Sequence, residues 1–322
     1  MHHIQLTNAA FEGRNSIYLL GADDAGAPTT LVDTGIATPA VEAELRDALA
    51  DGGASFADVD QVLLTHWHHD HSGLAGAIQA ESDATVYAHE ADAPLVAHDA
   101  GALDATESAR LECLDRWGMP AEKQRELEAV FDRHADLAGD PVDVTPLSDG
   151  DSVSLGGFDV EAVHLPGHAA GLVGYQFERD GRREAFVGDA ILPKYTPNVG
   201  GADVRVDRPL AQYLASLERV QSLDWDRAWP GHRGPIFAPN ARARDIAAHH
   251  DERTERVRSV VAEQGPVSAW DVSAELFGSL SSIHILHGPG EAFAHLDHLV
   301  HEGVLRETDG GEAGGPVRYA LA

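Results

Sequence analysis

The most constraining feature of this chain is a dense run of metal-ligating side chains that directly follows a short apolar strand. Residues 61–64, Gln-Val-Leu-Leu, are predicted to form a buried strand, and the run after it is His66-x-His68-x-Asp70-His71. Side chains two positions apart in an extended segment point to the same side, so we expect His66 and His68 to face one point. The helix predicted next turns Asp70 and His71 toward a neighbouring point. The spacing can therefore serve two metal ions that lie close together.

Three further candidate ligands stand at the ends of other predicted strands. His168 and His232 each follow a Pro-Gly pair, and Asp189 follows Val-Gly. A neighbouring glycine lets the backbone come close to a bound group, and loops at one edge of a rigid sheet are the usual place for sites. We therefore expect these three residues to join the first cluster. His69 lies on the opposite side of the turn and is predicted to be structural.

The ligand types indicate the chemistry of the site. Imidazole and carboxylate without thiolate suit Zn²⁺, and also Fe or Mn, so we expect two divalent ions as cofactors, most simply zinc. Two such ions about 3.5–4 Å apart can share a hydroxide that is a nucleophile at neutral pH. Asp70 is then the natural catalytic proton acceptor, and Asp33 is a candidate to orient a ligand histidine from behind. The alternative is a turn that merely carries satisfied polar side chains.

Strands and helices alternate along the first part of the chain, which predicts α/β layering. The strands are interrupted by a strongly charged helical insert, which we expect at about residues 90–140. A composition shift near Pro239 places a domain boundary at about residue 240. Residues 1–240 then form one domain. Residues 241–322 form a smaller one, whose three helices and two strands have a winged-helix-like outline.

The ligand candidates follow one another along the chain in the order typical of one family. By this order the chain resembles the metallo-β-lactamase-fold hydrolase superfamily over roughly residues 1–240. The resemblance implies an αββα sandwich with a dinuclear site between two mixed sheets, and Asp33 matches an early structural aspartate of that superfamily. It assigns one metal ion to His66, His68 and His168 and the other to Asp70, His71 and His232, with Asp189 as the bridge between them.

Several branches of the superfamily fit these residues less well. Cys113 lies in the insert and not at a ligand position, which disfavours the zinc β-lactamases that use a cysteine ligand. The β-lactamases with the histidine-rich motif generally lack the bridging aspartate, whereas Asp189 is present here. Flavodiiron-type electron carriers have glutamate where this chain has His68. Persulfide dioxygenases hold a single iron with fewer ligands.

The remaining hydrolase branch is similar to the glyoxalase II-like group through the runs 166–171, Pro-Gly-His-Ala-Ala-Gly, and 188–189, Gly-Asp. The insert and the tail are also similar to the β-lactamase-like-protein-2 group, whose members include endoribonucleases. We therefore predict a dinuclear metal-dependent hydrolase whose metal-bridging hydroxide attacks a small ester, thioester or lactone. The alternatives are a metal-dependent endoribonuclease or phosphodiesterase, and a noncatalytic metal-binding module.

The loop after Asp189 is expected to border the substrate, because it directly follows a predicted ligand. It contains Lys194, one of only two lysines in the chain, and Tyr195, between Pro193 and Pro197. The prolines stiffen the loop and reduce the ordering cost of binding. We predict that Lys194 anchors an anionic part of the substrate and that Tyr195 adds an aromatic wall. A solvated surface lysine is the alternative.

The charge balance restricts the classes of binding partner that we expect. The chain has 53 acidic against 23 basic residues, a formal net charge of −30. Such a chain repels nucleic acid and anionic membranes in ordinary buffer. A surface rich in carboxylates and poor in lysine resembles proteins of salt-loving organisms. We therefore expect a small-molecule substrate, no nucleic acid or membrane partner, and a folding stability that rises in molar salt, where the repulsion is screened.

The predicted tail is also acidic. Residues 241–322 contain seven Arg, no Lys and 13 acidic residues, a formal net charge of −6, whereas a nucleic-acid-binding winged helix is normally basic. We expect a packing module or a contact for a homo-oligomer. His295 and His298 share one face of a predicted helix. They could belong to a second metal site, and core or solvated histidines are the simpler interpretation.

The cellular location is inferred from missing signals. A single cysteine, Cys113, excludes an internal disulfide and fits a reducing compartment. No apolar run approaches the roughly 18 residues that a membrane span needs, and the N-terminus lacks the pattern of a signal peptide. These features together predict a cytoplasmic protein.

Overall fold

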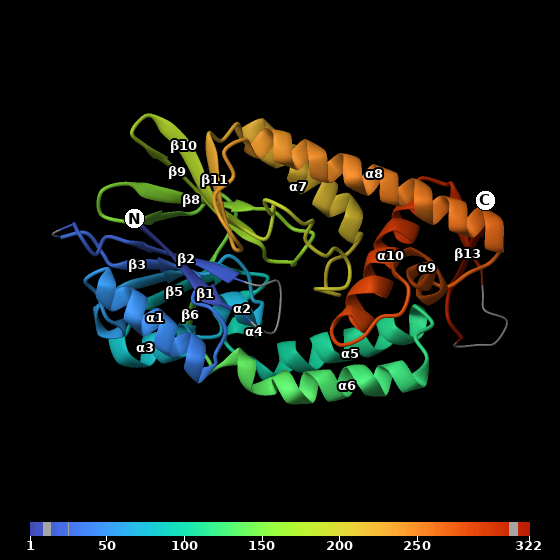
Figure 1. The fold of residues 1–322 in the computed structure, drawn as a ribbon, viewed down its shortest axis with the longest axis horizontal. Coiled ribbons are helices and arrows are strands. Elements are labelled where there is room, and N and C mark those ends of the chain that lie inside the picture. Colours follow the sequence, from blue (N-terminus) through green and yellow to red (C-terminus); the bar gives the residue numbers. More distant parts are fainter. Residues whose placement is uncertain (9–13, 25, 309–314) are drawn as a thin grey trace.

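Two β-sheets lie face to face in the computed structural model, which describes residues 1–8, 14–24, 26–308 and 315–322 (Figure 1). The first sheet contains, in spatial order, β1 (His2–Thr7), β2 (Arg14–Leu20), β3 (Thr30–Val32), β4 (Gln61–Leu63), β5 (Thr85–His89) and β6 (Val144–Leu147). The second sheet has the order β11-β10-β9-β8-β7 and contains β7 (Ser152–Ser154), β8 (Asp159–His164), β9 (Val173–Arg179), β10 (Arg182–Gly188) and β11 (Arg227–Pro230).

Helices cover the outer face of each sheet. The first sheet is covered by α1 (Pro39–Asp51) and α3 (Ala75–Ser82), and the second by α7 (Pro209–Leu223) and the first half of α8 (Pro239–Gln264). In α1, the Thr38 hydroxyl accepts from the Val41 amide and Pro39 occupies the first turn, which is the usual chemistry of a helix start. The order helix, sheet, sheet, helix confirms the predicted αββα sandwich.

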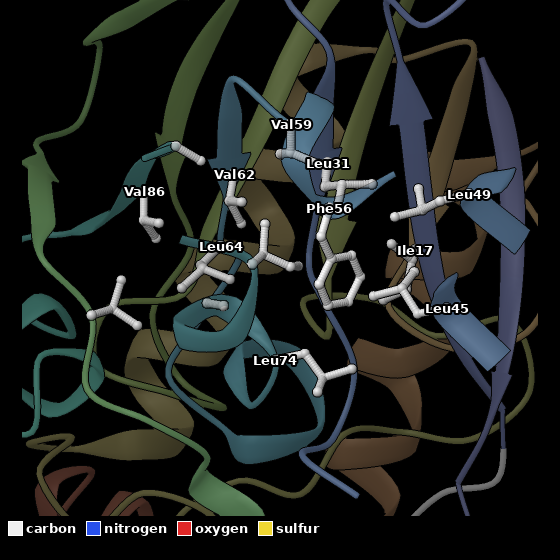
Figure 2. Close-up of a cluster of buried hydrophobic side chains, with 14 of the residues drawn as sticks. Ile17, Leu31, Leu45, Leu49, Phe56, Val59, Val62, Leu64, Leu74 and Val86 are labelled. Carbon is white, nitrogen blue, oxygen red and sulfur yellow. The ribbon is translucent and has the colours of Figure 1, made fainter. Parts of the chain in front are cut away.

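Successive side chains along a strand point to opposite faces of the sheet, so each one packs either between the two sheets or beneath the helices. In β2, Tyr18 faces the second sheet, and its ring centroid lies 5.0 Å from that of Phe186. The next residue back, Ile17, faces the helices instead and belongs to the same buried cluster as Leu45 and Leu49 of α1 (Figure 2). One run of apolar residues therefore fills both the space between the sheets and the space beneath the helices.

Strand direction brings the chemically important residues to one edge. Strands β3, β4, β5 and β6 pair in parallel, and in the second sheet β8, β10 and β11 share one direction. Residues that directly follow these strands therefore meet at a common edge. Asp33 follows β3, the His66 motif follows β4, and the loops with His168, Asp189 and His232 follow β8, β10 and β11.

The predicted helical insert contains α4 (Ala93–Val96), α5 (Ala100–Arg116), α6 (Ala121–His134) and the short 3₁₀ helix η2 (Ala135–Ala138). Gly118, with φ +78°, makes the break between α5 and α6. Trp117, Met119 and Leu127 are buried in one cluster with side chains of the C-terminal region, Leu296 among them. The insert therefore packs against the C-terminal part of the chain (Figure 1).

The C-terminal region contains α8, α9 (Ala269–Phe277), α10 (His284–His301) and the strand pair β12 (Leu305–Thr308) and β13 (Arg318–Leu321). The connection between these two strands includes residues 309–314, which lie outside the described residues. Helix α8 is continuous across the boundary predicted at residue 240: Ala243 and Ile246 pack with the second sheet and α7, and Val257 and Val261 pack in the C-terminal cluster. The boundary and the winged-helix comparison stay predictions.

Helix α10 begins earlier than the sequence suggests. The run Gly288-Pro289-Gly290 is locally typical of a helix break. The structure begins the helix at His284 and carries it through Pro289. Among the described residues, no helix is both long enough and apolar enough to span a membrane.

Candidate metal centre

Three histidine nitrogens converge where the two sheets meet. His66 Nε2 lies 3.0 Å from His68 Nδ1, which lies 3.1 Å from His168 Nε2. Zinc–nitrogen bonds of about 2.0–2.1 Å in a tetrahedral site place neighbouring nitrogens about 3.3 Å apart. These three residues, which we call the three-histidine group, therefore have a spacing that fits one metal ion.

A second set of ligand-type atoms lies beside the first and includes a carboxylate. Asp70 Oδ2 lies 3.7 Å from His71 Nε2 and 3.5 Å from His232 Nε2. The one-turn helix α2 (His69–Ser72) carries Asp70 and His71, while His232 comes from the loop after β11. We call these three residues the mixed group.

Asp189 faces both groups. Its Oδ1 lies 3.7 Å from His71 Nε2, and its Oδ2 lies 3.3 Å from His232 Nε2 and 3.7 Å from His168 Nε2. The seven residues chosen from sequence thus meet at one place.

Two buried atoms at this place have no hydrogen-bond partner among the described residues: His71 Nε2 and Asp189 Oδ1. Buried polar atoms in folded proteins nearly always have a partner, so an unpartnered lone pair facing other ligand atoms is the environment a metal ion fits. Imidazole and carboxylate donors without thiolate suit zinc, iron or manganese. The donor set and its spacing therefore fit divalent metal ions.

The second ring nitrogens of the three-histidine group are held by neutral acceptors. His168 Nδ1–H donates to the Asn198 carbonyl at 2.8 Å, and His68 Nε2–H donates to the Ala202 carbonyl at 3.1 Å. The nitrogens that face the metal position therefore keep their lone pairs. Such partners behind a ligand fix its ring orientation and its tautomer.

Asp33 holds the mixed group through its charge. Its Oδ2 accepts from His71 Nδ1–H at 2.8 Å and from the Thr65 hydroxyl at 2.9 Å, and its Oδ1 accepts from the Thr65 amide at 2.8 Å. The Thr65 hydroxyl in turn lies 3.1 Å from His66 Nδ1. Asp33 adopts φ +59°, a conformation that non-glycine residues rarely take. Its carboxylate is placed to orient His71 directly and His66 through Thr65.

The electrostatics of the two groups differ. In the three-histidine group, burial and the neighbouring histidines lower the pKa of His66 well below its usual range, and burial with His168 lowers the pKa of His68 to about 3. In the mixed group, burial by itself would lower the pKa of His71, but Asp70, Asp189 and Asp33 raise it to about 10. His66 and His68 are therefore neutral without metal, whereas His71 carries a proton.

Two asparagines near Asp70 escaped the sequence analysis. Asn15 Nδ2 donates to Asp70 Oδ2 at 3.1 Å, and Asn8 Nδ2 donates to the same oxygen at 3.2 Å. Both asparagines are buried. The signal in the sequence was a polar residue inside the apolar strand β2, but nothing local links it to Asp70.

A buried carboxylate pair bridged by one arginine also escaped the sequence analysis. Asp92 accepts from the Trp67 amide at 3.1 Å and the Gly171 amide at 2.9 Å. Asp203 accepts from the Ala170 amide at 2.9 Å and from the Trp67 indole at 3.2 Å. Arg205 lies 2.7 Å from Asp92 and 2.5 Å from Asp203. Burial raises the pKa of Asp92 to about 6 in spite of this arginine. The triad joins the loops that carry His68 and His168.

The predicted substrate residues are exposed. Lys194 Nζ lies 5.2 Å from the centroid of the Tyr195 ring, and Arg233, the residue after His232, has its guanidinium carbon 4.9 Å from the same centroid. Tyr195 is 44% exposed. Arg242 donates to the Leu192 carbonyl at 2.6 Å and to the Tyr195 carbonyl at 2.8 Å, which ties this loop to α8. Sequence analysis missed Arg233.

The C-terminal histidines pair differently from the prediction. His295 lies near His250 and Glu291, with its Nε2 3.4 Å from His250 Nδ1 and 3.8 Å from Glu291 Oε1. His298 instead lies 3.4 Å from Glu302. His69, predicted to be structural, packs its ring edge-on against Trp67, and burial lowers its pKa.

Two family models match parts of the chain. The family model of the metallo-beta-lactamase superfamily matches residues 11–232, and the model of the metallo-beta-lactamase-like C-terminal domain matches residues 255–322. A crystal structure of a metallo-beta-lactamase family protein from Thermus thermophilus superposes with a TM-score of 0.83 at 29% identity, covering 100% of this chain and 98% of that one.

Curated relatives show the same similarity. The probable metallo-hydrolase YqjP of Bacillus subtilis is 27% identical over 88% of this chain and 86% of its own length. A beta-lactamase-like protein 2 homolog of Drosophila melanogaster is 27% identical over 76% of this chain and 67% of its own length. A hydroxyacylglutathione hydrolase of Bdellovibrio bacteriovorus is 28% identical over 65% of this chain and 59% of its own length.

Proposed function

The chain belongs to the metallo-beta-lactamase superfamily, and from this premise we propose that it is a dinuclear metal-dependent hydrolase of a small ester, thioester or lactone. The observation that carries the proposal is the carboxylate of Asp189, whose two oxygens face histidines of both ligand groups. A carboxylate in this position can support two ions at the short separation that hydrolysis uses.

The three-histidine group would hold one ion and the mixed group the other. Bound there, the two ions would make a water molecule nucleophilic at neutral pH and polarise the scissile carbonyl. Zinc is the simplest choice for these donors, and iron or manganese would also fit.

Asp70 is the proposed proton acceptor. Burial alone would raise the pKa of its carboxyl group, but His71 and His232 hold it below its usual range, so the carboxylate is ionised at neutral pH. Asn8 and Asn15 fix its position by donating to Oδ2. A fixed, ionised carboxylate beside the ligands can take a proton from water without moving.

The substrate proposal rests on the group formed by the exposed Lys194 and Tyr195 and the half-buried Arg233. Two cations flank one aromatic ring, and Arg233 directly follows the proposed ligand His232, in a chain whose formal net charge is −30. This combination favours an acyl substrate with an anionic part, because it offers point charges and an aromatic surface.

Acyl substrates are supported over RNA by two further observations. One relative is named a hydroxyacylglutathione hydrolase. The strong net negative charge opposes the phosphate contacts from which most nucleic-acid affinity comes.

One experiment tests the whole proposal: metal analysis of the purified protein, combined with a hydrolysis screen over thioesters, lactones, phosphodiesters and RNA in molar salt. We expect close to two metal ions per chain and turnover of an acyl substrate. One iron with no second ion would contradict the dinuclear site. Cleavage of RNA without acyl hydrolysis would replace the substrate class.

Neighbouring histidines provide a matched control. His71→Ala should abolish turnover and reduce the metal content, because it removes a proposed ligand. His69→Ala changes a half-buried histidine of the same short helix, which lies outside both groups, and should keep both metal ions. Equal metal loss in the two variants would indicate general damage to α2 instead of a specific ligand role.

A further inference from the structure

The loop at residues 198–202 supplies the carbonyl groups behind two of the three histidines in the three-histidine group. His168 Nδ1–H donates to the Asn198 carbonyl and His68 Nε2–H to the Ala202 carbonyl. We call residues 198–202 the acceptor loop. Any shift of this loop would rotate both rings, because each ring has only one other nitrogen to direct at a metal ion.

Helix α10 of the C-terminal region holds the acceptor loop by hydrogen bonds. Glu291 Oε2 accepts from the Asn198 side-chain amide at 2.9 Å and from the Val199 backbone amide at 3.0 Å. The same Asn198 amide donates to the His287 carbonyl at 3.1 Å. Glu291 is only 4% exposed, so these bonds are shielded from water. The loop is therefore attached to α10 through its own backbone and through Asn198.

Glycines on both sides bring the two backbones into direct contact. A Cβ on Gly290 would overlap the Gly201 backbone, and a Cβ on Gly201 would lie 2.7 Å from the His287 Cα. Gly200 has φ +88°. Methyl groups at these positions would push the loop away from α10, because the atoms that they meet belong to backbone and cannot rotate aside. This contact gives a physical reason for a glycine at position 290 inside α10.

Glu291 is itself fixed from α8. Arg253 donates to Glu291 Oε1, and His250 and His295 lie 3.9 Å and 3.8 Å from the same oxygen. Burial alone would raise the pKa of Glu291, but His295 and Arg253 lower it to about 2. The carboxylate is therefore ionised and occupied on both oxygens by donors from the protein. Its place in the fold is that of an anchor between α8, α10 and the acceptor loop.

We propose that the C-terminal region positions the three-histidine group, with Glu291 and Gly290 as positioning residues that act through the acceptor loop. The proposal rests on the metal centre of the proposed function, and it adds that the two ligand groups are positioned by different parts of the chain. The mixed group has other supports: Asp33 holds His71, and His232 Nδ1 faces the Arg14 carbonyl at 3.3 Å. A fault in α10 should therefore weaken one metal position and spare the other.

The test measures metal affinity by competition with a chelator, and the absorption spectrum of the Co²⁺-loaded protein, in the full chain. Glu291→Gln keeps the shape of the side chain and loses its charge. Glu302→Gln is the matched control, because it makes the same change at the exposed end of α10. We expect Glu291→Gln to weaken one of two metal equivalents by about 10- to 100-fold, the range for partners behind a ligand, and Glu302→Gln to weaken neither.

A second pair of variants tests the glycine contact. Gly290→Ala places a methyl group against the acceptor loop, whereas Gly288→Ala places one against the Leu280 and Ser273 side chains of the neighbouring segment. Both variants should lower the melting temperature, but only Gly290→Ala should change the metal affinity and the Co²⁺ spectrum. If Gly290→Ala fails to fold, the Glu291→Gln result decides.

Single-group backgrounds identify the affected position. His232→Ala leaves the three-histidine group intact, and His168→Ala leaves the mixed group intact. The Glu291→Gln effect should persist in the first background and vanish in the second. Equal effects in both backgrounds, or unchanged affinities in a wild-type chain that binds two ions, would overturn this proposal. A wild-type chain that binds no metal would instead overturn the proposed function.

Discussion

The three-histidine group and the mixed group lie side by side, yet the protein supports them in different ways. The rings of His68 and His168 are held by backbone carbonyls of the acceptor loop. This loop is hydrogen-bonded to α10, which is distant in sequence. His71 is held by the buried carboxylate of Asp33, which directly follows β3 of the first sheet. The first group therefore depends on the position of a loop, and the second depends on charge.

The same contrast sets the protonation states. His68 is neutral because burial and His168 lower its pKa to about 3, whereas the pKa of His71 rises to about 10 among three carboxylates. A metal ion entering the first group meets free lone pairs. A metal ion entering the second must displace a proton. Two adjacent positions can thus respond differently to pH and to mutation.

The largest expected effect comes from Asp189, the residue that both groups share. Asp189→Ala should lower metal affinity at both positions by more than about 100-fold, beyond the range for partners behind a ligand, and should abolish hydrolysis. Elemental analysis and circular dichroism together check this. A folded variant that keeps two ions and full turnover would remove Asp189 from the bridge and leave the two groups independent.

The next largest effect should distinguish the mixed group from the three-histidine group. Asp33→Asn places an amide where the structure has a carboxylate facing His71, so the metal affinity of the mixed group should fall by about 10- to 100-fold. Asp60→Asn is the matched control, because Asp60 accepts from the Thr29 amide at the far end of the same strands. Titrations in the His168→Ala and His232→Ala backgrounds assign the loss. A loss confined to the three-histidine group would reverse our comparison.

The pH dependence should sharpen the contrast. Because the pKa of His71 in the metal-free fold is about 10, the apparent metal affinity of the mixed group should rise between pH 6 and 8 by about tenfold per unit for each proton displaced. The affinity of the three-histidine group should rise less steeply, because the pKa values of His66 and His68 lie well below this range. The two single-group backgrounds separate these curves, and identical slopes would contradict the assignment.

The raised pKa of His71 has a consequence for the metal-free fold as well. Its protonated form contributes stability that is complete below the ordinary histidine pKa of about 6.5 and is lost as the pH rises toward 10. Chemical denaturation of the metal-free protein at pH 7 and pH 9 checks the sign.

The smallest expected effect concerns substrate binding. Lys194 is exposed, so Lys194→Ala should raise KM for an anionic substrate by roughly fivefold, about 1 kcal/mol, and leave a neutral analogue nearly unchanged. Lys123→Ala, which removes the other lysine, is the matched control. Lys123 pairs with Glu126 on α6 and should have no effect. Equal changes for charged and neutral substrates would remove Lys194 from the site.

The sequence by itself determined the ligand candidates and the layer architecture, because both depend on local patterns. The His66 motif needed only the two-residue period of an extended segment, and His168, Asp189 and His232 needed only their positions after strands. Alternating strands and helices predicted only α/β layering, and the αββα order was implied by the resemblance to the superfamily. These signals lie within short stretches, so a reader of the sequence can recover them without knowing which stretches meet.

The tertiary structure alone decided what stands behind each ligand. Asn15 reaches Asp70 across 55 positions of chain, and Glu291 reaches Val199 across 92. No periodicity links residues so far apart, because their contact depends on how whole layers stack. Distant packing also explains α10. Gly-Pro-Gly is locally typical of a helix break, and only the close packing of Gly290 against the Gly201 backbone gives a reason for a glycine inside this helix. Sequence therefore specified the donors of this centre, and the packing of distant elements specified their orientation.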